Sequence, residues 1–401
     1  MKVITDSKKM KEILSRGVEE IIEKESLLKK LKSGKKLRIK HGVDPTGPSL
    51  HLGHSVVFRK LRHFQDLGHK IVFLIGDFTA LIGDPSGRME GRKPLTKKQV
   101  RKNMKDYVRQ TTKILNIKKV EVRYNSEWYE KKGAEFLMQL TSRFTFARVI
   151  ERDDFKRRIK EGVDVSMLEL IYPLLQGYDS VELKADVEIG GRDQKFNLLM
   201  GRKVQKKYGQ PQQDIITTPL LEGTDGVRKM SKSYNNYIGL DEEPSIMYGK
   251  IMSLPDGIMW KYFNLLTDIP LKEIEEMKEK KQKLLLSPRD IKARLAREIV
   301  TVYHGEKKAI TAEKEFNKVF AEKKLPSKIP IFKTLKRVYP ILDLLFDSKQ
   351  VASKNEAKRV ILQKGVKINN VLKTDWKEKI SLKDNMVIKV GKRKFVKVKL
   401  K

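Results

Sequence analysis

The alternation of strand-like apolar runs with helical patterns over residues 1–240 most constrains how this chain can fold. A short strand-like segment at 37–39 precedes a helical pattern that begins near His51, and residues 120–124 resume an extended pattern. Residues 71–75 form a continuous apolar run, which is typical of a strand buried on both faces of a parallel sheet. This order predicts an α/β fold with an open parallel sheet that binds ligands at the carboxyl ends of its strands.

A second helix in this region has a clear start. Thr96, with Gln99 three residues later, forms a capping box for a helix that should reach about Leu115. No Gly-x-Gly-x-x-Gly sequence follows the first strand, which disfavours a dinucleotide-binding interpretation of the sheet.

A turn comes directly before the helix near His51. Pro45 and Pro48 bracket the turn, and Ser49 is a candidate cap for the helix. The free N–H groups and the positive dipole end of a helix that begins here would favour a phosphate group.

That helix opens with His51-Leu52-Gly53-His54. His51 is a candidate donor to phosphate oxygens, with Thr46 beside it, and His54 lies on the same helix face. Gly53 would let an adenosine lie against the backbone, where any side chain would collide. Two histidines three residues apart also fit an ordinary helix surface or a metal pair, although no carboxylate within a turn completes a ligand set.

The second motif is Lys229-Met230-Ser231-Lys232-Ser233, about 175 residues downstream. Two lysines on a loop of small residues could close over the β- and γ-phosphates of ATP as charge develops there. Because lysine is abundant in this chain, a solvated surface turn is the alternative interpretation.

Together the two motifs fit the transfer of an adenylyl group from ATP to a carboxylate. Attack on the α-phosphorus drives negative charge onto the departing pyrophosphate, and an anionic carboxylate needs no general base. The protein must therefore position the carboxylate against the α-phosphorus and neutralise the charge on the departing pyrophosphate. The joint occurrence of both motifs after Asp44-Pro45-Thr46 is far more specific than either motif alone.

On these residues the chain resembles the class I aminoacyl-tRNA synthetases, in which the two motifs are the family signatures. More narrowly it resembles the bacterial tyrosyl-tRNA synthetases, in the branch with Lys-Met-Ser-Lys-Ser, through nearly all 401 residues. The resemblance implies a Rossmann-like catalytic domain. It is carried by four further segments: 44–46, 82–87, 172–179 and 190–194.

The resemblance implies a tyrosine pocket. Asp84, Tyr172 and Gln176 would hold the α-ammonium group of tyrosine, and Asp179 would accept a hydrogen bond from its phenolic hydroxyl. The spacing i, i+4, i+7 of the last three residues places them on one helix face. Without the resemblance, the same spacing also fits the wet face of an amphipathic helix.

The other implied contacts surround this pocket. Gln194 would face the reacting carboxylate, and Asn125 and Trp128 would line the tyrosine end. The positions implied on the ATP side are Asp44, Gly53, Gly191, Asp193, Met230 and Ser231, and the residues implied in the chemistry are Thr46, His51, His54, Lys229 and Lys232.

Asp179 also bears on selectivity. A buried carboxylate that a phenol satisfies would be left without a partner by phenylalanine, which supports discrimination without an editing domain. In one branch of the family a tyrosine shares the phenolic hydroxyl with this aspartate, but the corresponding residue here is Lys40. Glu188 stands where that branch often has glutamine. Both departures fit the second branch.

The charge balance fits a polyanionic partner. Lysine and arginine number 87 against 51 acidic residues, a formal net charge of +36, which favours RNA through counterion release. A membrane surface is the rival, but no spanning helix, lipidation signal or secretory leader is evident, and the cytoplasm is the simplest compartment. The chain has no cysteine, which excludes disulfides and cysteine-ligated zinc. No organic cofactor is expected, and the Mg²⁺ that accompanies ATP would be carried by the phosphates.

Three domains are expected. Residues 1–240 form the catalytic domain, in which the helical insertion at about 125–180 carries the contact of a homodimer by resemblance. Residues 241–330 are helical, with a start at Ser287-Pro288, and would approach the anticodon stem or serve as a solvated spacer. Pro326 and Pro330 mark a linker before the third domain, residues 331–401.

The tail from 331 to 401 holds 20 basic and 6 acidic residues. A second capping box, Ser353 to Glu356, opens a helix that carries the candidate RNA-binding residues Lys354, Lys358 and Arg359. Strands are expected at 366–368, before an Asn369-Asn370 turn, and over 387–398 with a turn at Gly391-Lys392. The pattern resembles the small α+β RNA-binding fold of the fourth protein of the small ribosomal subunit; a basic solubilising tail is the alternative.

The predicted function is a two-step tyrosine–tRNA ligase. Tyrosine and Mg-ATP would give tyrosyl adenylate and pyrophosphate, and the terminal adenosine of tyrosine tRNA would then take the tyrosyl group. Two alternatives remain open: a tryptophanyl enzyme of the same fold, and an RNA-binding paralogue without catalytic activity.

Overall fold

The computed structural model describes residues 2–47, 49–85, 95–320, 329–391 and 394–400. The chain divides into two compact units, Met1–Glu313 and Lys314–Lys401. Four predicted features lie wholly or partly outside the described residues: Pro48 in the turn, Ser86-Gly87 in the segment 82–87, Pro326 in the linker and Lys392 in the hairpin turn.

The first unit is built on a six-stranded sheet with the strand order β1-β6-β5-β2-β3-β4. Its strands are β1 (Glu20–Ile22), β2 (Arg38–Val43), β3 (Lys70–Ile75), β4 (Val120–Tyr124), β5 (Val187–Gly191) and β6 (Asp214–Thr218). β2 to β6 are parallel to one another, which confirms the predicted open parallel sheet, and β1 adds an antiparallel edge that the sequence did not indicate. Every residue of β3 from Ile71 onward is buried, as its continuous apolar run predicts.

The order of the strands reverses between β2 and β5. β2 leads outward to β3 and β4 on one side, while β5 leads to β6 on the other. Only Ile39 with Val187 and Lys40 with Glu188 pair between β2 and β5, so the two strands stop pairing well before β2 ends. A crevice at such a reversal, beyond the carboxyl ends of the strands, is where an open α/β sheet binds its ligand.

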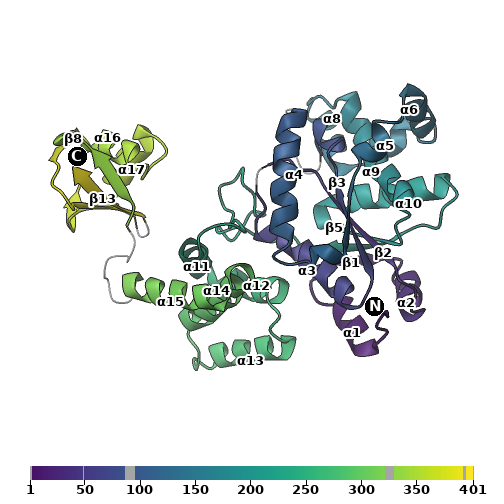
Figure 1. The fold of residues 1–401 in the computed structure, drawn as a ribbon, viewed down its shortest axis with the longest axis horizontal. Coiled ribbons are helices and arrows are strands. Elements are labelled where there is room, and N and C mark those ends of the chain that lie inside the picture. Colours follow the sequence, from purple (N-terminus) through teal and green to yellow (C-terminus); the bar gives the residue numbers. More distant parts are fainter. Residues whose placement is uncertain (1, 48, 86–94, 321–328, 392–393, 401) are drawn as a thin grey trace. The chain divides into compact units, whose positions relative to one another are not determined.

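The helices that flank the sheet include α3 (Leu52–Asp66), α4 (Lys97–Thr111), α9 (Met167–Glu182) and α10 (Lys195–Lys207), together with α1 (Ser7–Ile13) and α2 (Lys24–Lys32) (Figure 1). The capping box of Thr96 with Gln99 is present, but α4 ends at Thr111, earlier than expected. The expected cap at Ser49 is wrong: α3 begins later, with His51 at the N-cap position. The backbone N–H of His51 donates to Nδ1 of His54, so two residues of the motif cap the start of the helix.

Residues 125–180 are largely helical, as the sequence predicts. They contain α5 (Ser126–Tyr129), α6 (Ala134–Thr141), α7 (Phe146–Val149) and α8 (Asp153–Lys160) and lead into α9. The side chain of Ser166 caps α9 by accepting the backbone N–H of Glu169. The carboxylate of Glu169 forms a buried ion pair with Arg158 at 2.7 Å, which ties α8 to the start of α9.

After the sheet the chain is helical, as expected, with α11 (Pro244–Met252), α12 (Met259–Leu266), α13 (Leu271–Gln282), α14 (Pro288–His304) and α15 (Glu306–Phe320). α11 to α14 gather in one group (Figure 1). The start of α14 is confirmed, because Ser287 accepts the backbone N–H of Asp290 and Pro288 occupies the first turn.

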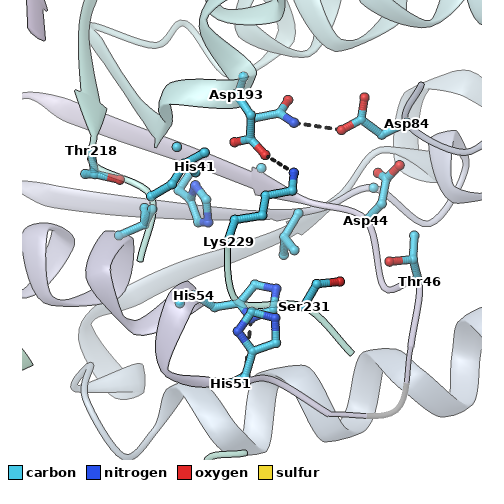
Figure 2. A pocket seen from close by; sticks show the side chains of 18 of the residues that line it. His41, Asp44, Thr46, His51, His54, Asp84, Asp193, Thr218, Lys229 and Ser231 are labelled. Carbon is cyan, nitrogen blue, oxygen red and sulfur yellow. Dashed lines mark hydrogen bonds and ion pairs between the residues drawn. The ribbon is translucent and has the colours of Figure 1, made fainter. Parts of the chain in front are cut away.

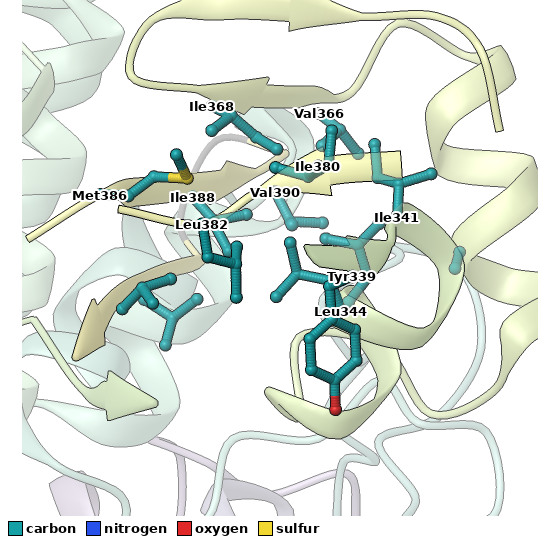
Figure 3. Packing of buried hydrophobic residues seen from close by; sticks show 14 of the residues in the cluster. Tyr339, Ile341, Leu344, Val366, Ile368, Ile380, Leu382, Met386, Ile388 and Val390 are labelled. Atoms are coloured by element: carbon teal, nitrogen blue, oxygen red, sulfur yellow. The ribbon is translucent and has the colours of Figure 1, made fainter. Parts of the chain in front are cut away.

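The second unit has its own core. A five-stranded sheet has the order β10-β9-β12-β13-β7, and β8 pairs with β11 in a second, two-stranded sheet. These strands are β7 (Ile331–Thr334), β8 (Val338–Pro340), β9 (Val366–Ile368), β10 (Val371–Lys373), β11 (Lys379–Ser381), β12 (Val387–Val390) and β13 (Lys394–Leu400), and the helices are α16 (Ile341–Asp347) and α17 (Lys354–Leu362). Figure 3 shows how side chains of both helix and strand segments, among them Leu344, Val366 and Ile388, close this core.

The turn predicted in the tail is present, and the predicted helix cap is partly formed. Asn369 and Asn370 have φ values of 46° and 68° between β9 and β10, as a two-residue hairpin turn requires. Ser353 accepts the N–H of Glu356, but the predicted capping box is only half formed, because Glu356 accepts the N–H of Ala352 instead of that of Ser353. The small α+β unit is therefore present as expected.

Candidate functional site

A cavity of about 710 Å³ lies beyond the carboxyl ends of the parallel strands. Its walls come from the ends of β2, β3, β5 and β6, from α3 and α9, and from the loop that carries Lys229 (Figure 2). The predicted site residues that line it are Asp44, Thr46, His51, Gly53, His54, Asp84, Tyr172, Gln176, Asp179, Gly191, Asp193, Gln194, Lys229, Met230 and Ser231.

The two sequence motifs meet at one wall of this cavity. The backbone N–H of Leu52 donates to Ile238 at 2.9 Å, and that of Leu240 donates to Leu50 at 3.1 Å. A Cβ placed on Gly53 would lie 3.6 Å from Cβ of Met230 and 3.0 Å from the ring of His51. The segment after the lysine-rich motif therefore pairs with the start of α3, and Gly53 fits a position where a side chain would crowd both motifs.

The two histidines of the first motif are packed together. Their ring centroids are 3.9 Å apart, and Figure 2 shows both rings beside Ser231. Burial, with the charge of Lys232 nearby, lowers the pKa of His54 to about 4 and the pKa of His51 well below its usual value. Both rings are therefore neutral at pH 7 and act as hydrogen-bonding groups without a charge.

The loop of the second motif is held by a buried amide. Oδ1 of Asn236 accepts the N–H of Ser231 at 2.8 Å, and its Nδ2 donates to Asp225 and to the carbonyls of Arg228 and Lys229. These bonds fix the direction in which the lysines leave the loop. Nζ of Lys229 lies 3.0 Å from Oδ2 of Asp193, across the cavity mouth (Figure 2).

Lys232 approaches the turn before α3. A Cβ on Gly47 would lie 3.1 Å from Nζ of Lys232, so this side chain reaches the turn that contains Thr46. Desolvation lowers the pKa of Lys232, and the side chain is half-buried.

Asp179 is the buried carboxylate at the other end of the cavity. It is 2% exposed and accepts Nε1 of Trp128 at 3.0 Å and Nδ2 of Asn125 at 3.4 Å. Burial raises the pKa of Asp179 to about 7, and Lys40 and the surrounding donors act in the opposite direction. Tyr172 and Gln176 lie on the same helix face and also line the cavity, as the spacing predicts.

A hydrogen-bonded chain joins this end to the ATP-side residues. Tyr172 donates to Oδ2 of Asp44 at 2.9 Å, Thr79 donates to Oδ1 of Asp44 at 2.8 Å, and Asn125 donates to Thr79 at 3.0 Å. Because Asn125 also contacts Asp179, three side chains, Tyr172, Thr79 and Asn125, bind the two carboxylates, and the last two link them.

Asp84 and Gln194 face each other between the two ends. Nε2 of Gln194 donates to Oδ2 of Asp84 at 2.7 Å, and Arg152 lies 3.8 Å from Oδ1 of Asp84. Oε1 of Gln176 is buried and has no hydrogen-bond partner in the described part of the chain. An amide oxygen and a carboxylate of this kind suit an ammonium group.

Comparisons with known proteins agree with this arrangement. Residues 32–321 match the family model of the class I tRNA synthetases for tryptophan and tyrosine (W and Y). The chain belongs to this family. It is 50% identical over 386 residues to the tyrosine–tRNA ligase of Aquifex aeolicus, covering 96% of this chain and 97% of that one, and 49% identical to that of Thermotoga maritima, covering 96% of each.

Solved structures lead to the same family. A C-terminally truncated mitochondrial tyrosyl-tRNA synthetase of Aspergillus nidulans matches with a TM-score of 0.66 and 25% identity, over 77% of this chain and 93% of that one. The tyrosyl-tRNA synthetase of Archaeoglobus fulgidus, solved with L-tyrosine, shares the fold with a TM-score of 0.63 and 23% identity, over 76% and 99% of the two chains.

Sequence reasoning missed several cavity residues of this class I synthetase. Nδ1 of His41 donates to the carbonyl of Ile189, 2.9 Å away, and so bridges β2 and β5 where their backbones no longer pair. Thr79 links Asp44 to Asn125. His41 lies within β2 and Thr79 lies four residues beyond the end of β3, and neither residue type suggests a role until the strands are placed side by side.

The candidate RNA-binding residues of the synthetase lie on α17, in the second unit. Lys354 forms an ion pair with Asp343 at 2.6 Å, and Nζ of Lys358 lies 4.2 Å from the ring centre of Trp376. Arg359 is exposed. Of the three, Lys354 would have to leave an existing partner before it could bind a phosphate.

Among the described residues, no group of three or more histidine, aspartate or glutamate side chains is arranged to hold a metal ion. In the same part of the chain, no helix is both long and apolar enough to cross a membrane.

Proposed function

We propose that this class I synthetase is a tyrosine–tRNA ligase, which forms tyrosyl adenylate and pyrophosphate from tyrosine and ATP. It then transfers the tyrosyl group to a ribose hydroxyl of the 3′-terminal adenosine of tyrosine tRNA, and AMP leaves. The observation that carries the proposal is Asp179, a buried carboxylate that lines the same cavity as residues of both family signatures. The relatives at about 50% identity over nearly the whole chain, which are named tyrosine–tRNA ligases, support it.

In the first step tyrosine lies between the two ends of the cavity. Asp179 accepts the phenolic hydroxyl, while Asp84, Gln176 and Tyr172 hold the ammonium group. Gln194, which contacts Asp84, faces the tyrosine carboxylate. That carboxylate attacks the α-phosphorus, the bond to the β-phosphate oxygen breaks, and pyrophosphate leaves with the electron pair.

ATP lies along the start of α3. Gly53, Gly191 and Asp193 take the adenosine, and His51, His54 and Thr46 donate to the phosphates. Lys229 and Lys232 neutralise the charge that develops on pyrophosphate, with Met230 and Ser231 holding the loop between them. ATP enters as its Mg²⁺ complex, with the metal carried by the phosphates.

The second step needs tRNA, and its proposed contacts lie outside the cavity. Residues 1–240 would hold the catalytic domain, 241–330 would approach the anticodon stem, and Lys354, Lys358 and Arg359 in 331–401 would bind RNA phosphates. Such contacts add affinity more than sequence choice. The proposed compartment is the cytoplasm.

A homodimer is part of the proposal. The insertion before and at the start of α9 exposes a group of large apolar side chains: Leu137, Met138, Phe146, Ile159, Met167 and Leu168. Their exposed fractions run from 39% to 71%, and so many exposed apolar side chains in one insertion support a contact with a second copy of this chain.

The deciding experiment is pyrophosphate–ATP exchange with tyrosine, tryptophan and phenylalanine supplied separately. We expect exchange with tyrosine alone, and its loss in Asp179→Ala. Exchange with tryptophan alone would replace tyrosine by tryptophan as the substrate. No exchange with any amino acid, together with tight RNA binding, would instead indicate a paralogue without catalytic activity.

A further inference from the structure

Lys40 is fully buried beneath the tyrosine end of the cavity, and the reaction described above does not use it. Its Nζ forms an ion pair with Oε1 of Glu188 at 2.8 Å, and Glu188 is itself 1% exposed. The two residues are directly paired across β2 and β5, and they are the last pair before the two strands separate around the cavity. An ion pair therefore stands at the point where the crevice opens.

The same ammonium group also reaches the helix that carries Asp179. It donates to Oγ of Ser180 at 2.7 Å and to the carbonyl of Gln176 at 3.2 Å. These residues stand on either side of Asp179 along α9, so Nζ of Lys40 is held against the turn of the helix from which that carboxylate projects.

Three neighbours hold Glu188 in place. Its Oε2 accepts Ser180 at 3.2 Å and also accepts Nε2 of Gln213. A Cβ on Gly201 would lie 2.5 Å from Nε2 of Gln213 and 3.1 Å from Oε2 of Glu188, so only glycine leaves room for this cluster. The ion pair has a fixed orientation, with its positive end toward α9.

Among the described residues, the ionisable groups that act on Asp179 include Lys40 on β2, Tyr129 on α5 and Tyr172 on α9 itself. Burial raises the pKa of both phenols, so they stay neutral at physiological pH. Of these three groups, Lys40 therefore supplies the charge that acts on the carboxylate.

We propose that Lys40, oriented by Glu188, is a positioning residue that favours the ionised form of Asp179 and so strengthens the preference of the pocket for a phenol. A charged acceptor left unpaired costs more than a neutral one, so an ionised Asp179 rejects phenylalanine more strongly than a protonated one. The inference rests on the proposed role of Asp179 and extends it to a residue that touches neither substrate.

The test uses variants with opposite expected signs. Lys40→Met should move the acid limb of the pH profile of kcat/KM for tyrosine to higher pH by about one unit, and Glu188→Gln should move it to lower pH. At pH 7, Lys40→Met should reduce the tyrosine-to-phenylalanine ratio of kcat/KM about 5-fold, because a one-unit rise in the pKa of Asp179 lowers its ionised fraction from about one half to about one tenth. Shifts in the same direction, or no shift, would overturn the proposal.

Lys40→Met leaves Glu188 buried without its partner and can fail to fold. The double variant Lys40→Met/Glu188→Met removes both charges, which proteins often tolerate. A folded double variant should still show the raised acid limb and the reduced ratio. Full recovery of the wild-type profile would mean that the pair is only structural and would overturn the proposal.

Lys30→Met is the matched control, because Lys30 pairs with the buried Asp214 at 2.9 Å and neither residue lines the cavity. It should lower thermal stability without moving the acid limb. The wild-type enzyme is assayed first. If the wild-type enzyme shows no tyrosine-dependent exchange, the proposed function is wrong. If the wild type exchanges normally but the acid limb of the variants does not move, only this inference is wrong.

Discussion

The two lysines of the second motif differ in what surrounds them, and only Lys229 lines the cavity. Lys229 is 37% exposed and is neutralised by Asp193 at 3.0 Å, whereas Lys232 is half-buried, close to the neutral rings of His51 and His54. A desolvated cation gains more from an approaching negative charge than a solvated one. Lys232 should therefore contribute most where charge develops, on the departing pyrophosphate.

We expect Lys232→Ala to slow tyrosyl adenylate formation by about 100-fold, the effect typical of removing one transition-state donor, while the Kd for tyrosine changes little. Single-turnover kinetics and equilibrium binding of tyrosine would measure the two quantities. Lys206→Ala, which removes an exposed lysine of α10, is the control and should change neither. Equal losses in rate and in tyrosine binding would show that Lys232 is not selective for the transition state.

The carboxylate of Asp179 should cost stability in a pH-dependent way. Its pKa is raised to about 7 by burial, so between about pH 4 and pH 7 the folded state holds its proton more tightly than the unfolded state does. The cost of the buried charge is thus absent at low pH, grows through this window and is complete above pH 7. The ionised carboxylate that is proposed to bind the phenol therefore lowers the stability of the folded state.

Asp179→Asn should accordingly gain stability relative to wild type as the pH rises, by on the order of 2 kcal/mol between pH 5 and pH 8, while losing tyrosine exchange. Urea unfolding of both proteins at the two pH values measures this difference. An unchanged difference would mean that Asp179 does not titrate in this range.

At the scale of elements, the sequence predicted what depends on neighbours along the chain. The apolar run of β3, the capping box of α4 and the shared face of Tyr172, Gln176 and Asp179 all follow from local spacing, and all are present. The Ser49 cap failed because His54 competes for the same helix end from inside the helix. β1 was missed because its three residues pair with β6, almost 200 positions away.

For the site as well, the sequence predicted the local motifs but not the contacts between distant segments. The motifs indicated which segments bear the chemistry, but the ion pair of Lys40 with Glu188 and the link from Asp44 through Thr79 to Asn125 join different strands and loops. Their partners are set by strand order, which no local pattern contains. A lysine in a strand, taken alone, suggests exposure, and only the pairing of β2 with β5 explains its complete burial.

The loop of the second motif depends on one amide. Asn236 is 3% exposed and holds Ser231 and the carbonyls of Arg228 and Lys229. We expect Asn236→Ala to reduce kcat for pyrophosphate exchange about 10-fold with the KM for tyrosine unchanged, because the lysines lose their fixed direction. Asn235→Gly is the control, since this exposed residue has a φ of 51° that glycine adopts freely. A rise in the KM for tyrosine alone would contradict this role.

At the scale of the whole molecule, the exposed apolar group on the insertion should set the oligomeric state. Met138→Glu combined with Phe146→Glu places two charges among side chains that are 70% and 63% exposed in the single chain. Sedimentation should show a dimer for wild type and a monomer for this variant, because burying an unpaired charge in an interface is costly. Lys156→Glu, an exposed change on α8, should leave the dimer intact. A monomeric wild-type protein would remove the proposed interface.

Removal of the second unit should affect the two steps of the reaction differently. All cavity residues lie within Met1–Glu313, whereas the second unit packs around its own core. A chain ending at Phe320 should therefore retain tyrosine-dependent pyrophosphate exchange within about 3-fold, since exchange needs no RNA. Aminoacylation of tRNA should fall at least 10-fold at moderate salt, because the basic tail that would bind phosphates is missing.

The salt dependence of tRNA binding gives a second measurement. For the full-length enzyme, the KM for tRNA should rise more steeply with salt than for the truncated enzyme, because the loss of phosphate contacts reduces the salt dependence. Equal salt slopes would show that the second unit does not bind the RNA backbone, and loss of exchange on truncation would show that it supports the cavity itself.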